Sequence, residues 1–239
     1  MKRIIIIALS LLAVATALRA QEKFKVTPVD FNHVKEVTSN PRSIYFYPKL
    51  LSSFIEKRND TTLTIEAYRN LYYGYTFTED YSPFRTSIYS DKVEQLYYKQ
   101  PHSRAECDSI EKYAELSLRD NLFDLNQMQF YIYVLKEKKK YARASVQQYR
   151  LDRLIAAIMS SGKGTKESPW VVIAPEHEYN IINFLGYLAV DHEELEGGLE
   201  FVKVTPQGDQ RAIEGFYFDT RRMMQVAALK FPDEEDALP

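Results

Sequence analysis

Apolar side chains recur with the spacing of an amphipathic helix through residues 41–161. One such stripe holds Cys107, Ile110, Ala114 and Leu118, which fall on the same side of a helix. Because five further stripes follow the same period, this span predicts a helical domain. These helices are expected to begin near Pro48, Thr64, Ser90, Asp124 and Tyr141.

Short polar residues mark the starts of several of these helices. Thr64 is a predicted N-cap, and Asp124 starts a later helix, because such side chains accept a hydrogen bond from the first turn. Ser103 and Glu106 form the pattern of a capping box, in which each side chain satisfies the other residue's backbone N–H. Gly74 is expected to end the helix that Thr64 begins.

The hydrophobic period changes after Pro169. The expected elements are a strand over 170–174, a helix opening at Pro175 and Glu176, and strands over 187–195, 199–205 and 211–218. The pair Gly197-Gly198 predicts a two-residue hairpin turn, and residues 205–209 predict a second turn. The fold class is therefore α+β: a helical N-terminal portion, then a small antiparallel β-sheet with one helix.

The first twenty residues have the pattern of a signal peptide. Lys2 and Arg3 precede an uncharged run over 4–14, which is too short to span a bilayer comfortably. Cleavage is expected after Ala17 or Ala20. A membrane anchor or a buried N-terminal helix is the alternative interpretation. The protein is expected to be exported to the periplasm or the cell envelope, without a lipid anchor because no cysteine lies near the cleavage region.

Charge and composition limit the classes of partner that the protein is expected to bind. Loss of residues 1–20 would move the net charge from −2 to −5, because that segment carries three basic residues and no acidic one. An acidic chain argues against nucleic acid, and no second apolar run is long enough to span a membrane. Cys107 is the single cysteine, so no internal disulfide can form, and its place on an apolar stripe favours a buried hydrophobe over a nucleophile.

The stretch Ser160–Ser168 contains Gly-Lys-Gly-Thr and resembles a phosphate-binding loop at first sight. A true loop of this kind follows a strand and opens a helix, with its lysine after the second glycine. Here Lys163 comes before that glycine. The order of elements is also reversed, because a helix precedes this stretch and a strand follows it. Nucleotide binding is therefore not expected, and residues 162–169 are interpreted as a linker. The other expected parts are an extended arm over 21–40, an α+β domain over 170–228 and an acidic tail over 229–239.

Two histidines lie beside carboxylates: His177 stands between two glutamates, and His192 follows Asp191. Imidazole and carboxylate groups together can bind a divalent metal. Adjacent residues point apart on both helices and strands, however, so each histidine would need partners from elsewhere in the chain. They are interpreted as solvated residues, with no metal, cofactor or catalytic residue assigned. No G-x-S-x-G nucleophile motif is present.

Six of the 18 tyrosines are concentrated in two short segments, residues 44–51 and 71–84. Tyrosine offers an apolar ring and a polar tip, which suits binding to peptides, proteins or sugars. Core packing is the favoured alternative for most of these rings. Tyr73 and Tyr75 flank Gly74 and are expected to be the more exposed. The candidate binding residues are Tyr45, Tyr47, Tyr73, Tyr75 and Tyr81.

The segment NLFDLNQMQFYIYVLKEKKKYARASVQQY, residues 121–149, resembles a tetratricopeptide helical hairpin. The matching residues are Asn121, Asp124, Lys136, Tyr141 and Ala144. Lys138 stands where that repeat usually has glycine. A single degenerate match favours an antiparallel helix pair more than an array of repeats.

Three segments also resemble domain-of-unknown-function family 4919: SNPRSIYFYPKLL, DTTLTIEAYRNLYYGYTFTEDYSPF and SGKGTKESPWVVI. The resemblance covers about residues 35–225 and implies an exported protein of Gram-negative gut bacteria, with no known activity, cofactor or catalytic residue. The favoured hypothesis is a non-catalytic binding or scaffolding protein whose partner is a protein or peptide, with a glycan less favoured. The alternative is an envelope hydrolase or metal-dependent enzyme that uses scattered carboxylates with His177 and His192.

Overall fold

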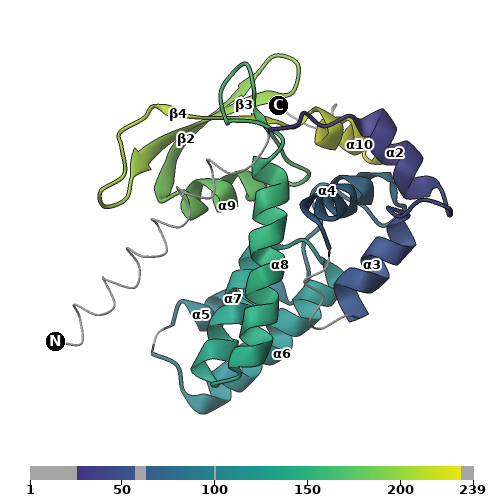
Figure 1. Ribbon diagram of the computed structural model, residues 1–239. Coiled ribbons are helices and arrows are strands. Elements are labelled where there is room, and N and C mark those ends of the chain that lie inside the picture. The colour runs from purple at the N-terminus through teal and green to yellow at the C-terminus, as the bar shows by residue number, and fades with distance from the viewer. Residues whose placement is uncertain (1–25, 57–62, 100, 233–239) are drawn as a thin grey trace. The chain divides into compact units, whose positions relative to one another are not determined.

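The computed structural model describes residues 26–56, 63–99 and 101–232 and shows an α+β protein (Figure 1). The chain forms two compact units, one over residues 31–157 and one that combines residues before 31 with residues from 158 onward. The predicted signal peptide lies outside the described residues, as does most of the predicted tail. None of the helices in the described ranges is both long enough and apolar enough to cross a membrane.

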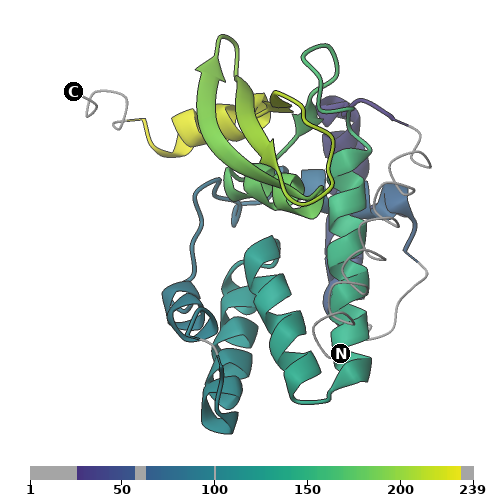
Figure 2. The ribbon, with the colours of Figure 1, turned by 90° about the vertical axis from the view of Figure 1, so that its left-hand side faces the viewer.

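The first unit is helical and begins earlier than expected. Its elements are α2 (Phe31–Ser39), α3 (Tyr47–Glu56), α4 (Ile65–Gly74), the 3₁₀ turn η1 (Tyr75–Phe77), α5 (Ser90–Tyr97), α6 (Arg104–Asp120), α7 (Leu125–Glu137) and α8 (Tyr141–Met159), whose last two residues belong to the second unit. The neighbouring helices α5, α6 and α7 pack together (Figure 2).

The extended arm predicted over 21–40 is wrong for residues 31–39, which form α2. Val34 and Thr38, four residues apart, are buried on one face of this helix, and α2 packs against α4. The sequence signal was weak because a nine-residue helix with two buried positions shows little periodicity. Its stability comes from packing on α4 more than from its own pattern.

The predicted helix starts are confirmed. Thr64 accepts a hydrogen bond from the Ala67 N–H, and Ser103 forms the complete capping box. The predicted end of α4 at Gly74 is confirmed, but Gly74 is not a left-handed cap, because its φ is −63° and the chain continues directly into η1. A Cβ atom at this position would lie 2.8 Å from Thr38 Cγ2. Glycine is needed here so that α2 can pack closely on α4.

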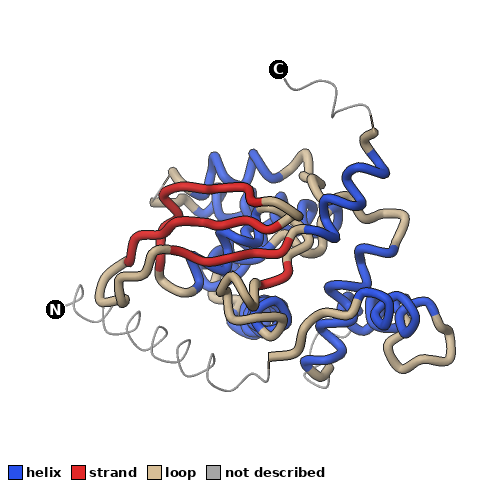
Figure 3. Tube along the Cα trace, turned by 90° about the horizontal axis from the view of Figure 1, so that it is seen from above, coloured by secondary structure: helices blue, strands red, loops and turns tan. Residues whose placement is uncertain are grey.

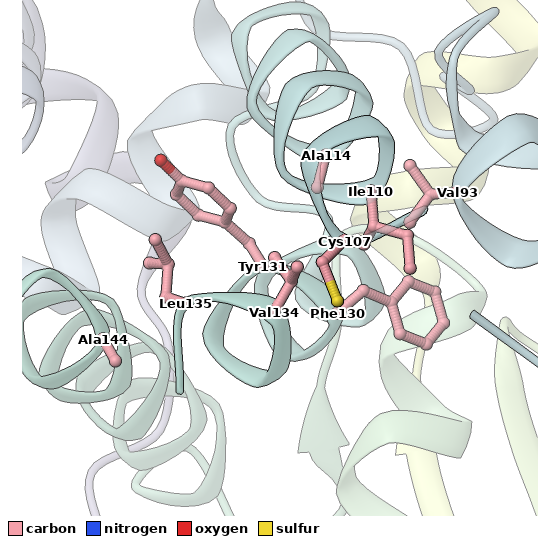
Figure 4. Close-up of a cluster of buried hydrophobic side chains, with 9 residues drawn as sticks. All are labelled: Val93, Cys107, Ile110, Ala114, Phe130, Tyr131, Val134, Leu135 and Ala144. Atoms are coloured by element: carbon pink, nitrogen blue, oxygen red, sulfur yellow. The ribbon is translucent and has the colours of Figure 1, made fainter. Parts of the chain in front are cut away.

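The predicted stripe of α6 faces a hydrophobic core shared with α5, α7 and the start of α8. Cys107, Ile110 and Ala114 are buried in it, and Leu118 is partly buried beside it. Figure 4 shows Cys107 among these apolar side chains, with Phe130 next to it. Burial raises the pKa of the Cys107 thiol, so the side chain stays neutral and acts as a small hydrophobe.

The second unit contains a four-stranded mixed sheet, whose strands are red in Figure 3. Its elements are β1 (Trp170–Val171), α9 (Glu176–Phe184), β2 (Tyr187–Leu195), β3 (Leu199–Pro206), β4 (Gly215–Asp219) and α10 (Arg221–Lys230). The strand order is β1-β4-β3-β2. The predicted two-residue hairpin turn is wrong, because the turn between β2 and β3 has three residues, Glu196, Gly197 and Gly198, with φ of 76° and 72° at the two glycines. The helix α9 packs against β2.

Two further details of this unit differ from the prediction. The sheet is not purely antiparallel, because β1 pairs with β4 in parallel. The unit also has a second helix, α10, which buries Met223, Val226 and Ala227 at helical spacing. Both features involve segments that are too short for a clear hydrophobic period: β1 has two residues, and α10 buries a single short stripe.

The predicted linker over 162–169 is a folded turn instead of an open connection. The Lys163 N–H donates to the Ser168 carbonyl at 2.7 Å, and the Trp170 indole N–H donates to the Gly162 carbonyl at 3.1 Å. Gly164 has a φ of +70°, and a Cβ atom there would lie 2.6 Å from the Trp170 ring. The glycines that resembled a phosphate loop are therefore needed for the turn and for packing against Trp170.

Candidate functional site

Three of the five candidate tyrosines gather around α3 and the end of α4. The ring centroids of Tyr75 and Tyr81 are 5.2 Å apart, and the Tyr75 hydroxyl donates to the Asp80 carbonyl at 3.3 Å. Burial raises the pKa of Tyr47, and Tyr75 and Asp80 raise it further. Tyr81 is buried, whereas Tyr47 and Tyr75 are half-buried. This cluster offers two partly accessible rings.

The expected exposure of Tyr73 is wrong, because its side chain is 0 % exposed. Its ring packs edge-on against Phe31 at 5.8 Å, and its hydroxyl donates to the Ala157 carbonyl at 3.5 Å. α4 is surrounded by other elements, so even the ring beside its final glycine is covered. Tyr45 lies half-buried in the loop before α3. A binding role for the tyrosines stays a prediction, and the accessible ones are its better candidates.

A groove of about 480 Å³ lies in the helical unit between α3, α6, α7 and α8. Its apolar side chains come from the four helices and from the turn between α6 and α7: Phe54, Ile55, Leu118, Leu122, Met128 and Val146. Phe54 and Met128 are themselves buried and form its floor, while Ile55 is 49 % exposed. The groove therefore presents an apolar surface that a partner side chain can cover.

Three arginines stand around this apolar surface. Arg119 pairs with Glu115, and Arg143 pairs with Glu111 and donates to the Tyr131 hydroxyl. Arg150 lies 5.0 Å from the centre of the Phe54 ring and donates to the Ile55 carbonyl at 3.5 Å. It pairs with no carboxylate in the part of the chain that the structure describes. Burial lowers the pKa of its guanidinium, because removing a charged group from water without a carboxylate partner is unfavourable.

Sequence reasoning missed this groove. The spacing of Arg143, Val146, Gln147 and Arg150 places the four residues on one face of α8, since i, i+3, i+4 and i+7 share a face. That pattern was visible in the sequence as a mixed basic and apolar face. What it could not show is that α3, far earlier in the chain, comes to lie beside this face.

A second cluster lies within the sheet unit and joins Glu178, His192 and Glu200. Glu178 is in the first turn of α9, His192 is on β2 and Glu200 is on β3. His192 is opposite Val202 in the strand register, so Glu200, two positions along, projects from the same face of the sheet. α9 packs against β2 and brings Glu178 to both.

The geometry of this cluster is tight. His192 Nε2 lies 2.7 Å from Glu200 Oε2 and 3.8 Å from Glu178 Oε2. The Glu178 side chain is 1 % exposed, whereas that of His192 is 33 % exposed. Burial, followed by the nearby charge of Glu200, raises the pKa of Glu178 to about 9. Two carboxyl groups and an imidazole with free electron pairs are a set that a divalent cation can bind.

The interpretation of both histidines as solvated residues is wrong for His177, which is 3 % exposed, and incomplete for His192. The sequence placed His192 among acidic neighbours, but its partners Glu178 and Glu200 lie 14 and 8 residues away along the chain. No sequence signal pointed to Glu200, because the predicted two-residue turn at Gly197-Gly198 would place it on the opposite face of the hairpin from His192. The turn has three residues, 196–198, which pairs Leu195 with Leu199 and brings Glu200 to the same face as His192.

Comparison with known proteins gives a family and no function. No curated protein and no solved structure matches the chain. The family model described as "Domain of unknown function (DUF4919)" matches residues 32–228, which include the groove and the Glu178–His192–Glu200 cluster. The match covers well over half of the sequence, and the chain therefore belongs to the DUF4919 family.

Proposed function

We propose that this protein is a non-catalytic peptide-binding module of the cell envelope. The observation that carries the proposal is the groove between α3, α6, α7 and α8, with its apolar floor and its arginines. The segment it accepts carries an apolar residue close to a carboxylate. The signal-like N-terminus supports an exported address.

The apolar part of the groove supplies affinity. Burying one leucine or phenylalanine side chain contributes roughly 1.5–3 kcal/mol, and the groove is large enough for such a side chain and its neighbours. Backbone groups of an extended or helical partner segment would meet Gln147, which lines the same groove. This part alone does not distinguish one apolar segment from another.

The arginines supply selectivity. Arg119 and Arg143 are occupied by Glu115 and Glu111, so that among the groove arginines Arg150 is the one without a carboxylate partner in residues 26–56, 63–99 and 101–232, and an incoming carboxylate can neutralise it. Because Arg150 is half-buried beside Phe54, a charge-assisted hydrogen bond there is stronger than at an open surface. An apolar residue seated on the floor would bring a neighbouring acidic group to this guanidinium.

Fluorescence polarisation with two pools of labelled heptapeptides tests this function. The first pool carries Leu or Phe two positions from Glu, and the second has Gln in place of Glu. The wild-type protein should bind the first pool saturably and about tenfold more tightly than the second, as expected for one charge-assisted hydrogen bond. Arg150→Gln should remove that preference while keeping weak binding of both pools.

Arg104→Gln is the matched control, because Arg104 is exposed at the start of α6 and does not line the groove. It should bind both pools like the wild-type protein. Thermal unfolding of each variant checks that the helical unit is intact. Failure of both pools to bind, or a preference for Glu that persists in Arg150→Gln, would reject the groove as a peptide site.

A second candidate function is a metal-dependent enzyme of the envelope. The specific observation in its favour is the approach of His192 to Glu178 and Glu200. Such an enzyme requires a bound metal before any chemistry, so the metal itself is the first property to test.

A further inference from the structure

We propose that Glu178, His192 and Glu200 form a binding site for a divalent cation, and that Zn²⁺ is the ion this ligand set fits. The site lies entirely within the sheet unit and is separate from the peptide groove. Its three ligands come from α9, β2 and β3, so secondary structure holds each of them in place.

The spacing of the ligand atoms suits a small tetrahedral ion. One nitrogen and two carboxylate oxygens, one from each residue, lie within 4.8 Å of one another. Ligand atoms around tetrahedral Zn²⁺ are about 3.3 Å apart, given metal–ligand bonds of roughly 2.0–2.1 Å. The separations of His192 Nε2 from Glu200 and Glu178, 2.7 and 3.8 Å, lie on either side of this value. Each of these two separations therefore differs from the tetrahedral value by roughly 0.5 Å.

A second observation points to a missing ligand. The Glu178 side chain is 1 % exposed, and its Oε1 accepts no hydrogen bond within residues 26–56, 63–99 and 101–232. A buried carboxyl oxygen without a partner is costly, and such groups are normally paired or bound to a metal. The other oxygen of this carboxyl group, Oε2, lies 3.8 Å from His192 Nε2, so an ion held by His192 and Glu200 would be within reach of the Glu178 carboxyl group.

The surroundings favour a cation. Glu178 also experiences the charge of Glu194, and further carboxylates occupy β2 at Asp191 and Glu193. Lys203 pairs with Asp191, away from the three ligands. The local field is therefore negative, which raises the concentration of cations at the site.

The ligand types select among cations. An imidazole with two carboxylates suits Zn²⁺ and related first-row ions, while Ca²⁺ and Mg²⁺ prefer six or more oxygen ligands. His192 is one-third exposed, so water can reach the site and supply a fourth ligand. A histidine hydrogen-bonded to Glu200 beside a buried Glu178, without any metal, is the competing explanation of the same geometry.

Isothermal titration of the full mature chain, without a histidine tag and after treatment with a chelator, decides between the two. Zn²⁺ should bind with one-to-one stoichiometry, and Mg²⁺ and Ca²⁺ should bind at least about 100-fold more weakly. His192→Gln, Glu178→Gln and Glu200→Gln should each weaken Zn²⁺ binding by about 100-fold or more. Co²⁺ should give the intense visible absorption of a tetrahedral site in the wild-type protein, and that band should be absent from His192→Gln.

Glu193→Gln is the matched control, because Glu193 is next to His192 on β2 but projects from the opposite face of the strand. It removes the same charge and should leave Zn²⁺ affinity within about twofold of the wild type. If Glu178→Gln does not fold, the variants of the more accessible His192 and of Glu200 carry the test. Absence of one-to-one binding, or ligand variants that bind like Glu193→Gln, would overturn the metal site.

Discussion

At the residue scale, single positions in this chain are explained by close contacts that sequence patterns do not contain. Gly164 is the clearest example. Its place in Gly-Lys-Gly-Thr resembled a phosphate loop, but its left-handed φ of +70° and the Trp170 ring explain why glycine is required. Gly197 also has a positive φ, of 76°, yet a Cβ atom there would meet nothing within 4 Å. These two glycines separate the cost of backbone conformation from the cost of crowding.

Gly164→Ala should therefore destabilise the protein much more than Gly197→Ala. Gly197→Ala, the control, should lower the free energy of unfolding by about 1 kcal/mol, the penalty for a side chain in the left-handed region. Gly164→Ala adds a clash with a buried ring and should lower it by about 3 kcal/mol. Urea unfolding followed by Trp170 fluorescence gives both values. Equal losses in the two variants would show that the Trp170 contact is not a packing constraint.

At the element scale, local signals predicted how helices begin better than how they are held together. The side chains of Thr64, Ser103 and Asp124 cap their helices as expected, because a cap depends only on residues three or four positions apart. By contrast, α2 was missed because it depends on packing against α4. Contacts between elements likewise explain Glu111, a buried carboxylate on α6 that meets the basic turn after α7.

Glu111 links helices through charge, and this link should depend on pH. Burial raises the pKa of Glu111, but hydrogen bonds and charges from Lys138 and Lys140 outweigh it and hold the pKa below its ordinary value of 4.5. The ionised form therefore stabilises the fold above pH 4.5, and this contribution is lost as the pH falls through the lowered pKa. Glu111→Gln should lose about 2 kcal/mol at pH 7 and much less near pH 3.

Urea unfolding of the wild type and Glu111→Gln at both pH values measures this difference. Glu36→Gln, which changes an exposed carboxylate on α2, is the control and should cost little at either pH. A deficit in Glu111→Gln that is the same size at pH 3 and pH 7 would mean that the contribution of Glu111 is not electrostatic.

At the scale of the whole molecule, the sequence predicted the order of the parts, with helices first and a small sheet afterwards, since hydrophobic period distinguishes the two. Neither candidate site could be predicted in the same way. The groove depends on α3 meeting α8, and the Glu178–His192–Glu200 cluster depends on strand register and on the packing of α9. Both sites combine residues that are distant in sequence, and membership of DUF4919 supplies no role for any of them.

The central claim is that the groove of the helical unit binds an apolar and acidic peptide. Methyl-detected NMR of the full chain, with labelled Ile, Leu and Val side chains, tests this most directly. Titration with the Glu-containing heptapeptide pool should shift the methyl signals of Ile55, Leu118, Leu122 and Val146 in a saturable manner, while Leu195 and Val202 of the sheet unit stay unchanged. Groove methyl signals that do not move at saturating peptide, or shifts centred on the sheet unit, would contradict the account.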